Sequence, residues 1–217
     1  MRILSKILVC MALLLGGSSS FIALAQTASA ASNPAAAFAK SLQGRLASFD
    51  YSYSMSGSLA MNGSGSVKLQ GNAFTMEGNG LDIRCDGKTR WTVDVVAEEC
   101  YIENIDAQEL DYEANPALLV GALDSAFNYK DSSTASFNGM SVSEIRLVPK
   151  KKGSSINEVS LFLTQGNQPA GVNVSSSDGN LITITIRNYK LDNSLDLSAF
   201  RLNTKELGKD YVITDLR

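Results

Sequence analysis

Apolar residues recur at helical spacing in residues 33–49, NPAAAFAKSLQGRLASF. Steps of three and four residues place these side chains on one side of a helix. Pro34 suits the first turn, because the N–H that proline lacks has no partner there. The pattern therefore predicts one amphipathic helix, whose apolar face is made by Phe38, Leu42, Leu46 and Phe49.

From Tyr51 onward, apolar and polar residues alternate instead. Tyr51, Tyr53 and Met55 are separated by serines, and this period of two is typical of strands with one apolar face. Glycine and asparagine at 62–63, 71–72 and 78–80 predict turns between the strands. The segment therefore predicts an antiparallel meander, in which the alternation continues through Val67, Leu69, Phe74, Met76, Leu81, Ile83 and Cys85.

A second apolar segment interrupts the strands at residues 114–127, ANPALLVGALDSAF, and predicts a short helix entered through Pro116. Strand patterns resume at 141–149, 158–166, 170–177 and 181–189. Residues 196–217 predict a short turn and a final edge strand. Runs of antiparallel strands with few helices predict an α+β fold with one large antiparallel sheet, which is expected to curl.

The start of the chain has the order of a secretory signal peptide. Arg2 and Lys6 precede a short apolar run at residues 7–15, and small residues follow it. The run is shorter than the roughly 20 residues that span a bilayer. We expect cleavage after Ala25, with Ala30 as the alternative, which leaves residues 26–217 as a single soluble, exported domain.

Charge argues against nucleic acid as a partner. Cleavage after Ala25 removes Arg2 and Lys6 and no acidic residue, so the formal net charge falls from −3 to −5. The sequence contains no basic stripe, and Lys150–Ser154 is its one basic cluster. A solvated loop explains that cluster better than a binding patch does.

The chain contains no histidine, which removes His-based triads and most zinc sites. No phosphate loop, nucleophile elbow or dinucleotide fingerprint occurs. Asp86, Asp94, Glu98 and Glu99 are interpreted as solvated hairpin ends rather than paired carboxylates or calcium ligands. The sequence therefore predicts a protein without enzymatic activity, metal or cofactor.

Cys85 and Cys100 bracket the stretch CDGKTRWTVDVVAEEC. The spacing fits neither a complete zinc site nor a thioredoxin-type motif. Exported proteins often pair their cysteines. Hairpin turns at 86–87 and 95–98 would, however, separate the two by a whole strand, roughly 10 Å sideways, whereas a disulfide spans no more than about 7 Å between Cα atoms. Both alternatives stay open.

Several of these features together resemble the LolA-type outer-membrane lipoprotein carriers. The signal peptide, the short helix and the meander are followed by DGKTRW at 86–91 and ECYI at 99–102. A helix after Asn115–Pro116 and the terminal segments FRL and VITDLR are similar as well. The resemblance covers nearly all of the chain after residue 25.

The resemblance implies an incomplete antiparallel β-barrel whose concave apolar face is covered by short helices. It implies a monomeric periplasmic carrier that holds an acylated lipoprotein or a related lipid and moves it toward the outer membrane. Its partners would be an inner-membrane release complex and an outer-membrane acceptor. The alternative is a sensor or adaptor of the same fold that binds another envelope protein. The residues expected to line the lipid cavity are Leu42, Leu46, Met55, Val67, Leu69, Phe74, Met76, Ile83, Trp91, Val93, Leu118, Leu119, Leu123, Leu161, Leu163 and Ile184.

One departure from the family pattern concerns the turn after the third strand. Family carriers often place an arginine followed by proline there, and the arginine helps to latch the helical lid. Here the turn is Gln70-Gly71-Asn72. Either the latch is absent, or Arg84 or Arg90 replaces it, or the protein binds something else.

Overall fold

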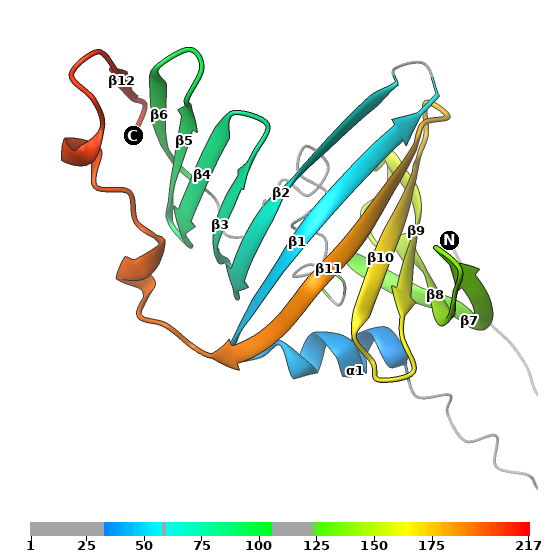
Figure 1. The fold of residues 1–217 in the computed structure, drawn as a ribbon. Coiled ribbons are helices and arrows are strands. Elements are labelled where there is room, and N and C mark those ends of the chain that lie inside the picture. Colours follow the sequence, from blue (N-terminus) through cyan, green and yellow to red (C-terminus); the bar gives the residue numbers. More distant parts are fainter. Residues whose placement is uncertain (1–32, 58–59, 106–122, 124) are drawn as a thin grey trace, which may run out of the picture. The chain divides into compact units, whose positions relative to one another are not determined.

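A computed structural model describes residues 33–57, 60–105, 123 and 125–217. They belong to one compact unit, Ser32–Arg217, which is built on a 12-stranded sheet with the order β12-β6-β5-β4-β3-β2-β1-β11-β10-β9-β8-β7 (Figure 1). The two outermost strands do not pair with each other, so the sheet is open, in agreement with the predicted incomplete barrel. The strands are β1 (Arg45–Ser56), β2 (Met61–Gln70), β3 (Ala73–Gly78), β4 (Leu81–Asp86), β5 (Thr89–Asp94), β6 (Glu99–Asn104), β7 (Phe127–Phe137), β8 (Met140–Pro149), β9 (Ile156–Leu163), β10 (Pro169–Ser176), β11 (Leu181–Asn193) and β12 (Val212–Asp215).

Helix α1 (Pro34–Ser41) is shorter than the helix predicted over residues 33–49. The side chain of Asn33 caps its start by accepting hydrogen bonds from the N–H groups of Ala35 and Ala36. The prediction is wrong beyond Ser41, because Gly44 takes a left-handed backbone conformation and ends the helical path. The residues that follow alternate between the two faces of β1, and this places Leu46 and Phe49 in a strand.

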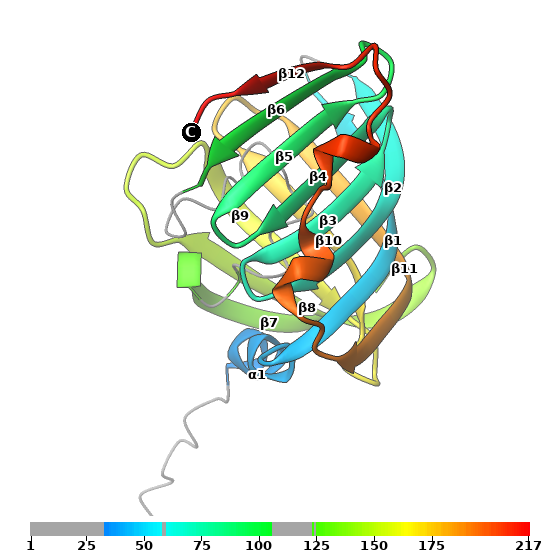
Figure 2. The ribbon, with the colours of Figure 1, turned by 90° about the vertical axis from the view of Figure 1, so that its left-hand side faces the viewer.

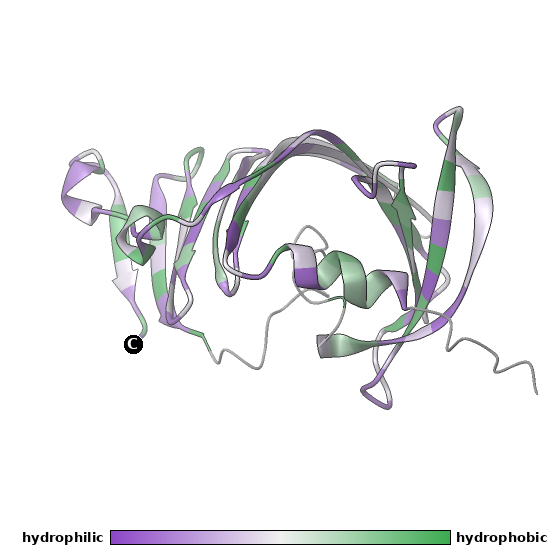
Figure 3. Cartoon of the chain, turned by 90° about the horizontal axis from the view of Figure 1, so that it is seen from below, coloured by the Kyte–Doolittle hydropathy of each residue, from purple (hydrophilic) through white to green (hydrophobic). Residues whose placement is uncertain are grey.

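The main core is an inner cluster, the set of buried residues on the side of the sheet toward which the strands curl. Figure 3 shows this curvature, with α1 inside the curve in the view from below. Residues from both halves of the strand order meet in the cluster, so its formation requires the curvature. It consists of Ala35, Phe38, Phe49, Tyr51, Val67, Leu69, Phe74, Cys85, Leu123, Phe127, Ile145, Leu147, Ile156, Val159, Leu161, Leu163, Val172, Val174, Ile184 and Ile186.

Glycines in β2 make room for two tyrosine rings from β1. The sequence pattern predicts a turn at Asn62–Gly63, but both residues lie inside β2. Gly63 is opposite Tyr53 and Gly65 is opposite Tyr51. A Cβ atom at Gly63 would lie 2.6 Å from a ring carbon of Tyr53, closer than side chains pack. These glycines therefore serve close packing inside the sheet, and the turn prediction is wrong at this position.

The C-terminal segment crosses the outer face of the sheet, over β3, β4 and β5 (Figure 2). It contains two short 3-10 helices, η2 (Leu197–Phe200) and η3 (Thr204–Glu206). Gln70 fixes its start, because the side-chain amide bonds the backbone N–H and C=O of Leu195 at 2.7 and 2.9 Å. The segment ends in β12, which runs parallel to β6, so the predicted last edge strand is confirmed.

Asp86 provides a second attachment for this segment through its ion pair with Arg201, at 2.8 Å. Its carboxylate also accepts hydrogen bonds from the N–H groups of Lys88 and Thr89, which close the predicted hairpin turn. Burial alone would raise the pKa of Asp86, but these hydrogen bonds and Arg201 outweigh it and lower the pKa below its usual value. The carboxyl is therefore charged at neutral pH, and this acid has a structural role.

The second predicted helix, residues 114–127, lies mostly outside the described residues, and so do Leu118 and Leu119. Leu123 is described and is buried in the inner cluster. Phe127 begins β7, so the prediction that the helix includes Phe127 is wrong at its last residue. Within the described part of the chain, no helix is long and apolar enough to cross a membrane.

Candidate functional site

The candidate site is the inner cluster together with the pocket beside it. Cross-strand pairing explains why so many apolar side chains face the same way. Leu69, Phe74 and Cys85 lie opposite one another on β2, β3 and β4. Val67, Met76 and Ile83 form the next row. Because directly opposed residues share a face of the sheet, these rows build a continuous apolar surface.

The inner cluster consists of apolar and aromatic residues, with Tyr51 contributing the one hydroxyl among its buried members. The rings of Tyr51 and Tyr53 stack with their centroids 6.4 Å apart. Burial raises the pKa of Tyr51 most, and the nearby Tyr53 raises it further, so the phenol of Tyr51 is neutral at physiological pH. The surface is therefore suited to apolar groups, and in the described part of the chain no group of acidic or cysteine side chains could hold a metal ion.

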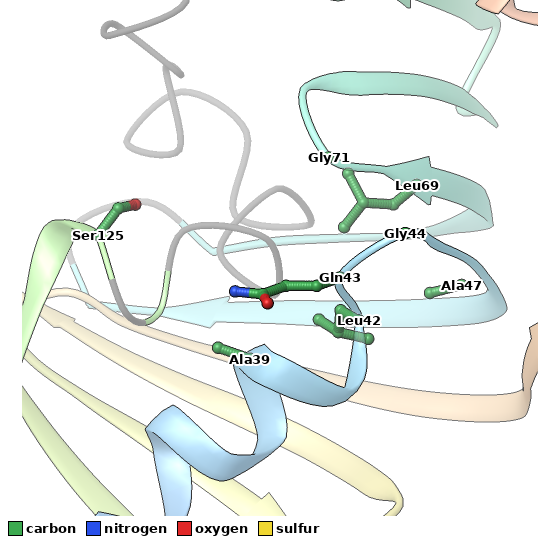
Figure 4. Close-up of a pocket in the computed structure, with 8 residues that line it drawn as sticks. All are labelled: Ala39, Leu42, Gln43, Gly44, Ala47, Leu69, Gly71 and Ser125. Atoms are coloured by element: carbon green, nitrogen blue, oxygen red, sulfur yellow. The ribbon is translucent and has the colours of Figure 1, made fainter. Parts of the chain in front are cut away.

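A pocket of about 230 Å³ opens where α1 meets the ends of β1 and β2. Figure 4 shows Leu42 below Leu69 on β2, with Ala47 on β1 at one side and the neighbouring Gln43 extending toward Ser125 at the other. Leu69 belongs to the inner cluster and Leu42 packs against it, so the pocket adjoins the apolar surface. Its lining residues are Ala39, Leu42, Gln43, Gly44, Ala47, Leu69, Gly71 and Ser125.

The structure brings most of the predicted lining residues together at the inner cluster. Buried members are Val67, Leu69, Phe74, Leu123, Leu161, Leu163 and Ile184. Leu42, Met76 and Ile83 are partly buried and pack against it. Two predicted residues, Leu118 and Leu119, lie outside the described residues.

Four other predicted residues are not members of the inner cluster. Trp91 and Val93 lie on the outer face, in an outer cluster with Cys100 and Ile102 that the C-terminal segment covers through Leu202, Leu207 and Tyr211. Leu46 also faces outward and packs with Ala73 and Phe200. Met55 faces the same side as the inner cluster but is only half-buried near the end of β1, opposite Met61 and Ile182. Strand parity explains why Leu46, Trp91 and Val93 face outward. Trp91, for example, is opposite Arg84 and next to Arg90, which is opposite Cys85.

Several residues of the inner cluster are missing from the lining predicted from the sequence. The helical spacing places Phe49 in the helix, and Ile145, Leu147, Val159 and Val172 are not among the predicted residues. The strand patterns at 141–149 and 158–166 indicate Ile145, Leu147 and Val159 as candidates, because they alternate as clearly as those of the N-terminal meander. Alternation alone does not say which set of residues faces inward.

The structure separates the two arginines that could replace the missing latch. Arg84 lies on the outer face opposite Trp91 and pairs with Asp82 at 3.0 Å. Arg90 lies on the inner face opposite Cys85 and pairs with Glu103 at 2.9 Å. Of the two, Arg90 is therefore the one that faces the same side as the inner cluster.

Cys85 and Cys100 are both free and buried. Cys85 belongs to the inner cluster and Cys100 to the outer cluster, so the sheet itself lies between them. The turns at 86–87 and 95–98 occur as predicted, and these turns place β5 between the two cysteines. Burial raises the pKa of both thiols, which keeps them protonated at neutral pH.

Both thiols are expected to resist modification in the folded protein. Cys10, the third cysteine of the sequence, lies in the expected signal peptide and is replaced by serine so that any uncleaved chain does not react. In this Cys10→Ser background, a soluble thiol reagent should react with Cys85 and Cys100 roughly 100-fold more slowly in buffer than in denaturant. Ser133→Cys, at an exposed position of β7, provides a control that should react at once. Rapid reaction of either native thiol in buffer, or a disulfide in mass spectra of the non-reduced protein, would contradict this arrangement.

The family model described as "Outer membrane lipoprotein carrier protein LolA" matches residues 59–203. None of the curated proteins matches the chain. An uncharacterized conserved protein from Thermus thermophilus has a similar solved structure, with a TM-score of 0.52 and 8% identity over 83% of this chain and 96% of that one. That likeness supports the fold alone.

Two further solved structures are similar at lower scores. A LolA superfamily protein from Nitrosomonas europaea has a TM-score of 0.44 and 8% identity over 78% of this chain and 98% of that one. MucB from Pseudomonas aeruginosa, in its complex with MucA, has a TM-score of 0.43 and 13% identity over 79% of this chain and 62% of that one.

Proposed function

Because the chain belongs to the LolA family of outer membrane lipoprotein carriers, we propose that it binds the acyl chains of lipoproteins, or a related lipid, and carries them toward the outer membrane. The observation that supports this most is the continuous apolar inner face, which runs through strands of both halves of the sheet. In this proposal the chain is exported to the periplasm, and residues 1–25 are removed there.

Acyl chains and this inner face are both apolar. Transfer of each CH₂ group from water to an apolar surface contributes roughly 0.8 kcal/mol, so a long chain gains much from a shelter of this kind. A buried polar group without a partner would oppose binding. No such group is presented to the ligand by the two rows of side chains, one with Leu69 and Phe74 and the other with Val67 and Met76.

The pocket at the end of α1 is the proposed entrance to this face. Its volume of about 230 Å³ is below the roughly 300–1,000 Å³ typical of small-molecule sites. A long acyl chain therefore requires the pocket to widen, and α1 is the element whose displacement would achieve this. Phe38 and Leu42 would separate from the strands, and flexible Met76 would adapt to the ligand.

The lid in this proposal differs from the one expected from the sequence. Its first helix, α1, lacks residues 45–49, which belong to β1, and its second predicted helix lies mostly outside the described residues. Gln70 does not act as a latch, since both polar atoms of its amide are engaged with Leu195. The proposed partners are an inner-membrane complex that loads the carrier and an outer-membrane acceptor that unloads it.

Replacement of Leu42 by glutamine is expected to weaken binding of a fluorescent fatty acid about tenfold. Leu42 lines the pocket and packs against the inner cluster, and the loss of one apolar side chain costs on the order of 1.4 kcal/mol of binding free energy. Binding can be measured by titration of the probe at fixed protein concentration. Leu197→Gln, an identical change at an exposed position of η2, should leave the affinity unchanged.

Two outcomes would contradict the carrier proposal. One is the absence of measurable probe uptake by the unaltered protein, together with the absence of lipid in mass spectra of material purified from a cell envelope. The other is an equal loss of affinity in the Leu42 and Leu197 variants, which would place probe binding away from the pocket.

A sensor or adaptor role is the second candidate. The small size of the pocket favours it, because the inner cluster is closely packed and Ile145, Val159 and Leu161 have no exposed surface. In this role the protein would bind an envelope protein without lipid cargo. Enrichment of one protein partner from detergent-free envelope extract, with no acylated lipoprotein, would support the adaptor role over the carrier role.

A further inference from the structure

The two edges of the sheet differ in how they discourage association with other strands. Strand β7 carries Lys130 and a run of serines, and a register irregularity falls between Tyr129 and Asp131. A lysine, polar side chains and a bulge are features that protect an edge from another strand. Strand β12 contains neither a lysine nor a register irregularity, although Thr214 and Asp215 are polar. Val212 and the neighbouring Leu216 are 62% and 63% exposed.

The hydrogen bonds to β6 determine which backbone groups of β12 face away from the sheet. The N–H of Val212 donates to Glu98 at 2.9 Å, and the N–H of Leu216 donates to Ile102 at 2.8 Å. In a parallel ladder, the N–H and C=O of one residue point to the same side. Residues 212, 214 and 216 therefore bond β6, whereas the backbone groups of Ile213 and Asp215 point outward.

The outward groups restrict the ways in which a second strand can add. If a second β12 pairs antiparallel, its own outward residues must form the hydrogen-bonded pairs. One such register pairs Ile213 of each copy with Asp215 of the other, and its two-fold axis passes between the Thr214 residues. Val212 of each copy then lies opposite Leu216 of the other, on the same face of the joined sheet.

This register brings together the most exposed apolar side chains of the segment. Val212 and Leu216 would cover each other in both halves of the pair, which removes apolar surface from water. No like charges would face each other directly, because Asp215 lies opposite Ile213. The strand is thus complementary to itself in its backbone groups and apolar contacts.

We propose that β12 is a self-association edge, at which a second copy of this chain adds its own β12 antiparallel, with Thr214 on the two-fold axis. The interface is small, well below the roughly 1,200 Å² of stable complexes. The dimer is therefore weak and forms at high protein concentration. The proposal replaces the monomer expected from the sequence, and it needs neither the pocket nor a lipid.

Cysteine cross-linking tests the register directly. In a Cys10→Ser background, Thr214→Cys is expected to give a disulfide-linked dimer under mild oxidation. The two Cα atoms of such a non-hydrogen-bonded pair lie about 4.5 Å apart, which a disulfide can span. Val212→Cys or Leu216→Cys alone should cross-link poorly, because each would be about 13 Å from its own copy along the strands. A mixture of those two variants should form the mixed dimer.

Two further variants separate edge pairing from chance collision. Ser133→Cys, exposed on the polar edge β7, should cross-link at least about tenfold more slowly than Thr214→Cys if edge pairing raises the local concentration. Ile213→Pro removes an outward N–H that β6 does not use. It should abolish the concentration-dependent dimer seen by sedimentation in the protein that lacks introduced cysteines.

The proposal would be overturned if Thr214→Cys cross-linked no faster than Ser133→Cys. It would equally be overturned if Ile213→Pro left the sedimentation behaviour unchanged. Preferential self-cross-linking of Ile213→Cys would also contradict it, because that result places the axis at residue 213. Circular dichroism of each variant verifies that the fold is retained.

Discussion

Replacement of Gly171 by alanine is expected to lower the free energy of unfolding by about 3 kcal/mol. Gly171 is buried in β10, where an added Cβ would come closer than 3.0 Å to the carbonyl oxygen of Ile184 and to the ring of Phe137. The carbonyl belongs to the neighbouring strand β11, and Phe137 stacks on Phe162 with ring centroids 4.3 Å apart. Neither neighbour can move without loss of pairing or packing, so the change over-packs the sheet.

Urea unfolding followed by circular dichroism measures this effect. Gly166→Ala is a matched control, because the nearest atom to its added Cβ is 3.8 Å away, an ordinary contact. Its unfolding free energy should change by less than about 0.5 kcal/mol. Equal midpoints for the two variants would show that β10 and β11 do not approach each other as described.

Replacement of Leu161 by alanine is expected to lower stability by a similar amount while strengthening ligand binding. Leu161 is fully buried in the inner cluster, opposite Ile145 and Val172. Truncation of a buried leucine costs roughly 2–5 kcal/mol of stability, because apolar contacts are lost and a cavity remains. If the inner face holds acyl chains, the same cavity should raise the affinity for a fluorescent fatty acid.

The two readouts together test the carrier proposal. Leu181→Ala, at an exposed position of β11, is expected to change stability by no more than about 0.5 kcal/mol and affinity not at all. Saturating probe should also restore part of the stability lost in Leu161→Ala, because a ligand that binds only the folded state stabilises it. A destabilised Leu161 variant whose probe affinity stays unchanged would locate the lipid site away from the inner cluster.

Alternation along the chain predicts most of the strands, because a period of two is a local property of a strand with one buried face. It does not predict which face is buried. Trp91 and Val93 are expected from the sequence to line the cavity. Successive residues of a strand face opposite sides of the sheet, however, and because Arg90 faces inward, Trp91 faces outward. The C-terminal segment then covers Trp91 with Leu202 and Tyr211, a long-range contact that no local pattern contains.

Helix α1 shows how two local signals can compete. Phe38, Leu42, Leu46 and Phe49 satisfy the helical period, yet Phe49 and Tyr51 also begin the strand period. The left-handed backbone conformation of Gly44 ends the helical path, and the strand begins directly after it. Long-range pairing of β1 with β2 and β11 then stabilises the strand, and the overlap of the two patterns makes the boundary unpredictable from spacing alone.

The position of β1 has a consequence for the order in which the protein can fold. Strands β2 to β6 pair in sequence, as do β7 to β11, so each half can form from neighbours along the chain. Among the described strands, the pairing of β1 with β11 joins the halves, and it brings Arg45 opposite Asn193. Contacts between residues so distant in sequence carry a large loop-closure cost and slow folding. During synthesis, one edge of β1 therefore stays unpaired until residues 181–193 are available, and an unpaired strand edge of this kind promotes aggregation.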